Sequence, residues 1–417
     1  MYRQNARNGT VPTMRVVRII TRLNVGGPSI QAITLSDRLT SRGIDTLLVH
    51  GRLGDAEGDM RYLLSAGVET RYLPALRRPV APLHDAVALA RILDILRAFR
   101  PHIVHTHMAK AGTLGRLAAA IYNRTSGRHG RARVVHTYHG HVLEGYFGSQ
   151  TATFFTWTER QLARLTDAIV AISPQIRNEL VDEFHIGRAD RYVVVPLGFD
   201  LTGLLAIDAD ARRRARAALR SEIGGASDID IDIDAHVVTT VGRLTAIKQH
   251  RLFLETARRL AGRDPGAVFL IAGDGELRSD LEDLARQFGI ADRVRFLGWR
   301  RDLATIYAAT DVFLLTSRNE GTPVALIESL AAGVPGVSTD VGGVGDVIDS
   351  EAVGLLAPFG DAKALAQHVA TLLADPERRR AMGARGRDAV AARYHVDRLV
   401  NDIEALYRDL VAAPLMS

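Results

Sequence analysis

Short, β-branched apolar runs alternate with amphipathic stretches along most of this chain of 417 residues. In the first half, such runs lie at 14–20, 46–50, 102–107, 133–138, 168–173 and 192–196, and they are too short for helices. Helical patterns separate them, over 31–42, 85–99, 111–122, 151–165 and 174–184. Strands that alternate with helices predict a parallel sheet covered on both faces, and right-handed crossovers make it doubly wound.

The alternation stops after residue 197 and starts again near residue 236. The interval holds an Arg-rich polar helix around 208–220 and the sequence GGASDIDIDIDAH, whose acids on one face argue against burial. Beyond it we expect strands at 236–244, 268–276, 293–299, 311–317, 333–340 and 354–358. Helices are expected between them at 249–261, 276–288, 302–309 and 323–332, and the helical stretches 361–373, 376–392 and 396–410 follow without strands between them.

These patterns predict an α/β protein with two Rossmann-like lobes. The expected parts are a disordered tail at 1–13, a first lobe at 14–197, a linker at 198–236, a second lobe at 237–392 and a helix at 393–417 that returns to the first lobe.

Composition excludes several classes of protein. Apolar residues make up 47% and charged residues 24% of the chain, as in ordinary globular proteins, so wholesale disorder is excluded. Cysteine is absent, which excludes disulfides, thiolate nucleophiles and cysteine-based metal sites. No apolar run is long enough to span a bilayer, and the start MYRQNARNGTVPT lacks the apolar core of a secretory signal. We therefore expect a cytoplasmic protein.

Charge is divided unevenly along the chain. Residues 1–200 carry 26 Lys and Arg against 16 Asp and Glu, whereas residues 201–417 carry 27 against 31. A basic half could meet nucleic acid, an anionic membrane or anionic substrates. The arginines are scattered and no nucleic-acid-binding motif is present, so no nucleic acid partner is expected. A solvated arginine surface and weak docking on an anionic membrane both remain open.

The segment Ser317–Glu328 carries the strongest chemical signal. It follows the apolar run DVFLL and opens a helix, with Pro323 suited to the first helical position. The free N–H groups and positive dipole end of such a helix form an anion site at the carboxyl edge of a sheet. Glu320 and Glu328 would flank that site, as a phosphate ligand with sugar hydroxyls requires, although both could also be ordinary acids at a helix start.

Two further loops could contact the same anion. Arg243 and Lys248 lie after a strand that ends at Gly242, and together they could neutralise a diphosphate. The turn Asn24-Val25-Gly26-Gly27 follows the first strand but is not GxGxxG, so it supports NAD binding only weakly. Its amides could still approach a phosphate, or the turn could be purely structural.

Histidines gather at the ends of two neighbouring strands of the first lobe. His105 and His107 share one face of the first strand, and His139 and His141 follow the second with the same spacing. This spacing could indicate metal ligands, but no carboxylate is interleaved with them. Polar contacts to a substrate are the preferred interpretation.

The motifs together resemble the retaining GT-B glycosyltransferases of family GT4, glycosyltransferase group 1. The spacing of Glu320 and Glu328 is the family's E-x7-E motif. The other matching motifs, in the family's order, are YHG at 138–140, GRL…K at 242–248, GDGE at 273–276, FLGW at 296–299 and AAGVPGVST at 331–339. The stretch at 137–147 is similar to a branch that acts on exopolysaccharides or lipid-linked glycans.

The resemblance implies a role for each matching residue. The first lobe would bind the acceptor and the second the nucleotide sugar, with a cleft between them. The donor diphosphate would contact Arg243, Lys248 and the amides of Gly27, Val324 and Ala325. Glu320 with the amides of Gly321 and Thr322 would hold the sugar hydroxyls, and His139 would contact the sugar near its 6-position. Glu328 would bind the ribose, and the base would lie near Trp299 and Arg300. Arg243, Lys248, Glu320 and His139 would then be the catalytic residues. The chain departs from the family at Gly343-Val344-Gly345-Asp346, where Gly-x-Pro-Glu is common.

The implied activity is transfer of a hexosyl group from a nucleoside diphosphate sugar, UDP-sugar favoured, with retention of the anomeric configuration. The acceptor would be a glycan or a lipid-linked glycan, in polysaccharide biosynthesis, and the enzyme could sit peripherally on the inner face of the membrane. No divalent metal or other cofactor is expected. Two alternatives remain open: a nucleotide-sugar epimerase of the same fold, for which Glu144 is the obvious acid of the first lobe, and a non-catalytic nucleotide-sugar-binding protein.

Overall fold

The computed structural model describes residues 14–24, 26–54, 57–127, 130–139, 149–224 and 235–414. They form two compact units. The first unit comprises Met1–Gly198 together with Val396–Ser417, and the second comprises Phe199–His395. The predicted N-terminal tail at 1–13 lies outside the described residues.

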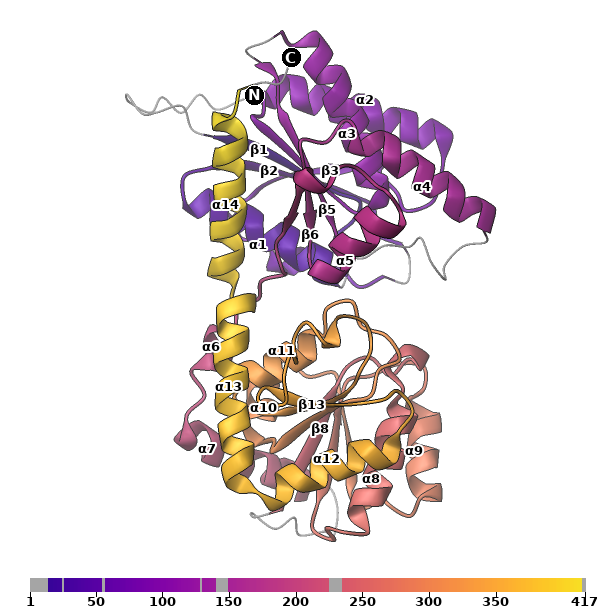
Figure 1. Ribbon diagram of the computed structural model, residues 1–417, viewed down its shortest axis with the longest axis vertical. Helices are drawn as coiled ribbons and strands as arrows, with labels where there is room; N and C mark the ends of the chain where they lie inside the picture. The colour runs from indigo at the N-terminus through magenta and orange to yellow at the C-terminus, as the bar shows by residue number, and fades with distance from the viewer. Residues whose placement is uncertain are drawn as a thin grey trace. The chain divides into compact units, whose positions relative to one another are not determined.

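The first unit is built on a parallel sheet with strand order β3-β2-β1-β4-β5-β6-β7 (Figure 1). Its strands are β1 (Arg15–Ile20), β2 (Asp45–Gly51), β3 (Glu69–Leu73), β4 (Ile103–His107), β5 (Arg133–Tyr138), β6 (Ala168–Ala171) and β7 (Tyr192–Val194). Its helices are α1 (Gly27–Ser41), α2 (Pro82–Phe99), α3 (Ala109–Thr125), α4 (Ser149–Ala163), α5 (Pro174–Asn178) and α14 (Val396–Ala412). Shorter helical turns occupy Arg61–Leu63, Glu179–Glu183 and Ala189–Arg191.

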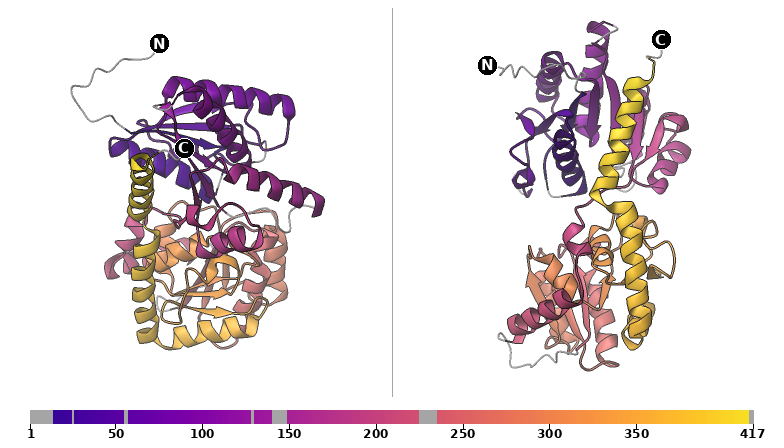
Figure 2. Two further views of the ribbon diagram at one scale, coloured as in Figure 1. Left: turned by 45° about the horizontal axis from the view of Figure 1, so that its top comes forward. Right: turned by 90° about the vertical axis from the view of Figure 1, so that its left-hand side faces the viewer.

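Side chains alternate across this sheet and bury both of its faces. Val17 and Ile19 of β1 point into a core that α2 and α3 cover, whereas Val16 points into a core that α1 and α14 cover. The last helix, yellow in Figures 1 and 2, packs beside α1, and Arg42 pairs with Glu404 at 2.9 Å. The predicted return of the C-terminal helix to the first lobe is confirmed.

The second unit is also a parallel sheet with helices on both faces. Its strand order is β10-β9-β8-β11-β12-β13, with β8 (Val237–Val241), β9 (Val268–Ala272), β10 (Val294–Gly298), β11 (Val312–Leu315), β12 (Gly336–Thr339) and β13 (Gly354–Ala357). Its helices are α6 (Thr202–Leu205), α7 (Ala209–Gly224), α8 (His250–Ala261), α9 (Arg278–Gln287), α10 (Leu303–Ala309), α11 (Val324–Ala331), α12 (Ala362–Ala374) and α13 (Pro376–Tyr394). Single helical turns occupy Ala246–Lys248 and Gly342–Val344.

The predicted alternation of strands and helices is confirmed in both halves, with differences in detail. Strand β3 was not expected, because its sequence ETRYL is mostly polar and the strand lies half-exposed at the sheet edge. Much of the segment 198–236, expected as a linker, is folded in the second unit. Within it, α7 buries Ala215 and Leu219, and Arg216 pairs with Asp311 at 2.6 Å. The Asp–Ile repeat at 228–234 lies outside the described residues.

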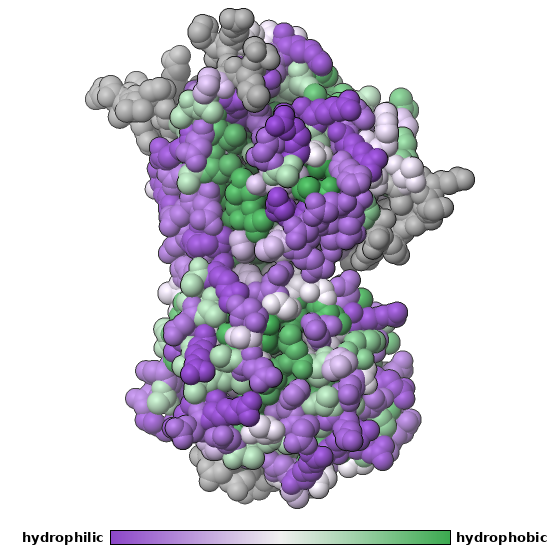
Figure 3. All heavy atoms as spheres, in the orientation of Figure 1, coloured by the Kyte–Doolittle hydropathy of each residue, from purple (hydrophilic) through white to green (hydrophobic). Residues whose placement is uncertain are grey.

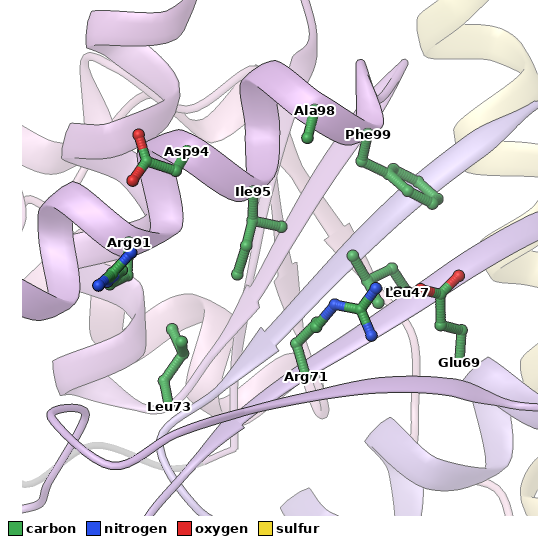
Figure 4. Close-up of a pocket in the computed structure, with 9 residues that line it drawn as sticks. All are labelled: Leu47, Glu69, Arg71, Leu73, Arg91, Asp94, Ile95, Ala98 and Phe99. Atoms are coloured by element: carbon green, nitrogen blue, oxygen red, sulfur yellow. Dashed lines mark ion pairs between the residues drawn. The ribbon is translucent and has the colours of Figure 1, made fainter. Parts of the chain in front are cut away.

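Hydrophilic side chains dominate the face drawn in Figure 3, and hydrophobic ones appear in patches within each unit. In the described part of the chain, no helix is both long enough and apolar enough to cross a membrane. A pocket of about 270 Å³ lies between α2 and the strands β2 and β3, and Figure 4 shows Arg71 and Glu69 on its wall. Its lining contains none of the predicted site residues.

Candidate active site

The strand order places a topological switch point in each sheet, between β1 and β4 in the first unit and between β8 and β11 in the second. Ligands of open α/β sheets bind at such points, outside the carboxyl ends of the strands. In the second unit, the loop after β8 runs through Gly242–Lys248 and the loop after β11 runs through Thr316–Pro323. The Arg318 amide donates to the Ile247 carbonyl at 2.8 Å, so the two loops lie side by side.

An ion pair joins these two loops. Lys248 Nζ lies 2.6 Å from Glu320 Oε1, and Ser317 Oγ donates to the same carboxylate oxygen at 2.5 Å. Glu320 is buried, whereas the Lys248 side chain keeps 28% of its surface exposed. An ammonium group has three donors, so Lys248 can hold Glu320 and still donate to an anion. Sequence reasoning found both charged residues but missed Ser317, whose hydroxyl helps to fix the carboxylate.

Gly342 and Gly343 pack closely against the backbone of the loop that carries Glu320. The Gly343 amide donates to the Glu320 carbonyl at 2.8 Å. A Cβ on Gly342 would lie 2.2 Å from that carbonyl oxygen, and Gly342 also has a φ of 50°. Larger residues would therefore displace the loop. The departure from Gly-x-Pro-Glu lies in the same turn, where Gly345 and Asp346 stand in place of Pro and Glu, and the Asp346 carbonyl accepts from Arg393 at 3.1 Å.

Glu328 lies inside α11 and is paired with a tyrosine that sequence reasoning missed. Tyr307, from α10, donates its hydroxyl to Glu328 Oε2 at 2.9 Å. Burial raises the pKa of the Glu328 carboxyl, and the tyrosine hydrogen bond partly opposes that rise. Tyr307 was not predicted because its sequence context is that of an ordinary core aromatic residue. Glu320 and Glu328 therefore occupy different environments, one ion-paired and one bonded to a neutral hydroxyl.

The other residues predicted in the second unit have few contacts. Arg243 is exposed, and its guanidinium bonds to no described residue. Pro323 was predicted to be the first residue of helix α11, but the helix starts one residue later, at Val324. The Val324 amide is already bonded to the Thr322 carbonyl at 2.9 Å, whereas no described residue accepts from the Ala325 amide. Gly321 is exposed on the loop before the helix.

Trp299 and Arg300 follow β10, beside the loop after β9, whose Gly273 amide donates to the Gly298 carbonyl at 2.8 Å. Trp299 keeps 67% of its surface exposed. Arg300 is engaged by Asp302 at 2.7 Å and by Glu222 of α7, and these two carboxylates raise the pKa of its guanidinium. The side chain of Arg300 is therefore occupied within the protein, and any contact to a base at this position would come from the backbone.

In the first unit, Gly27 and His139 both lie at the carboxyl edge of the sheet. Gly27 is the first residue of α1, and a Cβ there would press against Leu197 at 3.1 Å. His139 follows β5 directly, and its Nε2 lies 3.0 Å from His107 Nδ1. Burial lowers the pKa of His139 to about 3, so the ring is neutral at physiological pH.

The histidine cluster is more buried than predicted. His105, expected as a metal ligand or a substrate contact, is enclosed in the core and bonds to Tyr407 and Thr137 instead. His141 and Glu144 lie outside the described residues. Within the ranges that the structure describes, no three histidine or carboxylate side chains converge as metal ligands would.

The chain matches two family models. Residues 25–202 match the model described as Glycosyltransferase Family 4, and residues 227–389 match the model described as Glycosyl transferases group 1. The chain is 28% identical over 357 residues to a UDP-Gal:alpha-D-GlcNAc-diphosphoundecaprenol alpha-1,3-galactosyltransferase of Escherichia coli, covering 85% of this chain and 87% of that protein. It is also 28% identical to an alpha-D-kanosaminyltransferase of Streptomyces kanamyceticus, over 90% of this chain and 98% of the relative.

Solved structures share the fold. A glycosyltransferase of Rickettsia africae superimposes with a TM-score of 0.79 at 15% identity, over 97% of this chain and all of that one. HepE of Anabaena, solved in complex with UDP, gives a TM-score of 0.78 at 20% identity, over 95% of this chain and all of that one. The chain is a glycosyltransferase with two Rossmann-like lobes of the GT-B fold, and it belongs to glycosyltransferase group 1, family GT4.

Proposed function

We propose that this glycosyltransferase transfers a hexosyl group from a UDP-sugar to a glycan or lipid-linked acceptor, with retention of the anomeric configuration. The observation that carries the proposal is the Lys248–Glu320 pair at the β8/β11 switch point. It sets a cation with spare donors beside a fixed carboxylate, which suits a ligand that has both phosphate and sugar hydroxyls. The Escherichia coli relative is named for a UDP-Gal donor, and HepE was solved with UDP and with UDP-glucose, which favours a UDP-sugar here.

In this proposal, the second unit supplies most of the donor site. Arg243, Lys248 and the free Ala325 amide bind the diphosphate. The Glu320 carboxylate, with the amides of Gly321 and Thr322, holds the sugar hydroxyls. Glu328 binds the ribose with its orientation set by Tyr307, and the base lies against the backbone at Trp299 and Arg300. From the first unit, the Gly27 amide and His139 contribute contacts to the diphosphate and the sugar.

The proposed chemistry depends on positive charges that the folded protein already holds in place before the donor reacts. As the bond between the sugar and the diphosphate breaks, negative charge grows on the leaving phosphate and positive charge grows on the sugar ring. Arg243, Lys248 and the amino end of α11 would face the growing negative charge, and a preformed field of this kind can remove several kcal/mol from a barrier. The leaving phosphate then accepts the proton of the acceptor hydroxyl as that oxygen bonds to the anomeric carbon from the same face. No divalent metal is needed, because the protein supplies the cations.

The acceptor side of the proposal rests on charge and on the relatives. Residues 1–200 carry ten more basic than acidic residues, and such a surface favours anionic lipid headgroups. The Escherichia coli relative is named for a diphosphoundecaprenol acceptor. We infer a lipid-linked glycan as acceptor and a peripheral position at the cytoplasmic face of the membrane.

Calorimetry with UDP and with GDP tests the donor site, and a panel of UDP- and GDP-sugars assayed for slow donor hydrolysis identifies the donor. We expect UDP to bind and one UDP-hexose to be hydrolysed, with the same rates in EDTA. The absence of UDP and GDP binding at millimolar concentration would refute the proposal, and activity that requires added metal would refute the metal-independent mechanism.

Isomerisation of the donor instead of hydrolysis would identify an epimerase. The anomer formed on a product glycan, read by NMR, tests retention.

A further inference from the structure

The first half of helix α2 exposes apolar side chains where a surface helix ordinarily exposes polar ones. Leu83 keeps 84% of its surface exposed and Val87 keeps 52%, and Val80, just before the helix, keeps 75%. From Pro82 to Ala90 every exposed residue is apolar, and the first exposed charge on the helix is Arg91. We call Val80, Leu83 and Val87 the α2 surface.

The first turn of α2 is fixed at the carboxyl edge of the sheet. The helix follows β3, which runs parallel to β2, β1 and β4, so its first turn lies where these strands end. Lys110, shortly after β4, donates to both oxygens of Asp85 in that turn, at 2.7 and 2.6 Å. The Ala81 amide donates to Asp85 at 3.1 Å. The α2 surface therefore lies at the edge of the sheet where ligands of this fold bind.

The α2 surface points outward because the opposite face of the helix already fills the core. Ala88, Ile92 and Leu96 are fully buried against the sheet, at the spacing of four residues that marks one face of a helix. The α2 surface also lies outside the pocket of Figure 4, whose lining on this helix begins at Arg91. Aliphatic side chains that project without a cavity around them suit insertion into a lipid layer, which adapts its shape to them.

Arginines accompany the α2 surface. Residues 71–100 contain six arginines against two aspartates, so this segment supplies four of the ten excess positive charges of residues 1–200. Arg78 precedes the α2 surface, and Arg91 continues it by one helical turn. Both are exposed, and neither forms an ion pair or hydrogen bond with a residue that the structure describes. Their charge complements the anionic headgroups of a phospholipid layer, whose acyl chains would accept the aliphatic side chains.

We propose that the α2 surface inserts into an anionic phospholipid bilayer, with Arg78 and Arg91 at the lipid headgroups. The inference deepens the proposed function and rests on its lipid-linked acceptor, because it names the part of the first unit that meets the membrane. Docking in this way places the carboxyl edge of the first sheet beside the layer that holds such an acceptor.

The absence of cysteine allows a single reporter group to test the location. Leu83→Cys is labelled with the environment-sensitive fluorophore NBD, and Val411→Cys, at an exposed valine of α14, is the matched control. Vesicles of phosphatidylcholine and phosphatidylglycerol, about two to one, are then added. We expect the emission of the label at 83 to shift to shorter wavelength and that of the label at 411 to stay unchanged. No shift at 83, or equal shifts at both positions, would overturn the proposal.

Co-sedimentation with the same vesicles measures the contribution of each residue. Leu83→Asp and Val87→Asp should each lower the partition coefficient about tenfold or more, because each removes buried hydrocarbon. Arg78→Gln should lower it about fivefold, the contribution of one basic residue near an anionic surface. Val411→Asp should leave it unchanged. All four variants should keep the UDP affinity and donor hydrolysis of the wild type, because none of these residues belongs to the proposed donor site.

Three results would overturn the inference. They are equal partition of Leu83→Asp and wild type, equal binding to vesicles without phosphatidylglycerol, and a dimer of the wild-type chain that Leu83→Asp dissociates while no vesicles are bound. The last result, measured by analytical ultracentrifugation, would make the α2 surface a contact between copies. UDP binding without vesicle binding would refute this inference alone, whereas vesicle binding without UDP binding would refute the proposed donor site and leave the α2 surface in place.

Discussion

Lys248 is the residue on which the proposed chemistry depends most directly, because its ammonium group already orients Glu320 and has donors left for a phosphate. Lys248→Ala should lower turnover by roughly 10²–10³-fold, as the loss of one preorganised charge does in other active sites. Steady-state transfer or donor hydrolysis measures this. Lys363→Ala, which removes an exposed lysine outside the site, is the control. A Lys248→Ala enzyme within a few-fold of wild type would exclude the diphosphate role.

Glu328 makes a separate prediction, because its carboxylate faces a neutral tyrosine hydroxyl and not a cation. If it accepts hydrogen bonds from the ribose, Glu328→Ala should weaken UDP binding by about tenfold or more, since hydrogen bonds to charged groups contribute about 1.5–3 kcal/mol. Tyr307→Phe should have a smaller effect in the same direction, because it frees the carboxylate to rotate. Calorimetric titration with UDP measures both. Equal affinity in Glu328→Ala and wild type would contradict the ribose role.

At the residue scale, the sequence identified the charged groups but not their partners. Glu320 and Lys248 were recognisable because each follows an apolar strand in a loop that leads to a helix. Ser317 and Tyr307 were not, because a serine at a strand end and a tyrosine in a short helix are common in any α/β protein. His105 was misread, because the spacing of two residues places both histidines of β4 on one face without showing that this face is buried.

At the scale of strands β4 and β5, the buried histidines couple stability to pH. Burial lowers the pKa of His105, His107 and His136 well below the ordinary 6.5. In the unfolded chain these three histidines bind protons as the pH falls through about 6.5, whereas in the native chain they stay neutral there. The stabilisation is therefore complete above pH 6.5 and is lost as the pH falls below it, by about 1.4 kcal/mol per pH unit for each histidine.

Urea unfolding at pH 7.5, 6.5 and 5.5 measures this loss. Three histidines predict a drop of about 3 kcal/mol between pH 6.5 and 5.5. His105→Gln should lose less with falling pH, by about one histidine's share, although its stability at pH 7.5 is already lower. A free energy of unfolding that stays constant from pH 7.5 to 5.5 would show that these rings do not remain neutral in the native state.

The elements themselves follow from the sequence wherever burial dictates the pattern. Strands β1 and β4 are apolar on both faces because helices cover both, and their predicted limits agree with the observed ones within a residue or two. Strand β3 escaped prediction because an edge strand with Glu69 and Arg71 on it has no such pattern. Helix α7 was recognised as a helix but assigned to a linker, because its many arginines hid the few apolar positions that pack on the second unit.

At the scale of the whole molecule, two sheets of similar design have different charge and different chemistry. The excess of basic residues belongs to the first half of the chain. The residues proposed to bind the phosphates and the sugar belong mostly to the second unit. The sequence predicted the two Rossmann-like lobes because the β/α alternation is interrupted once. The return of the last helix to the first unit was also predicted, with the boundary placed at residue 393, although only His395 separates α13 from α14 and the observed boundary falls at Val396.

Helix α14 should therefore be indispensable to the first unit although it is the last element of the chain. Leu399, Val400, Ile403 and Tyr407 are fully buried against the sheet, and Arg398 donates to the Pro196 and Leu197 carbonyls. At about 1.5–3 kcal/mol for each buried side chain, their loss approaches the whole stability of a typical domain, about 5–15 kcal/mol. A chain that ends at His395 should lose the first unit's cooperative thermal transition and its slowly exchanging amides in β1 and β4. A chain that ends at Pro414 keeps every described residue and serves as the control, and normal hydrogen-exchange protection of β1 and β4 in the shorter chain would show that the sheet does not need α14.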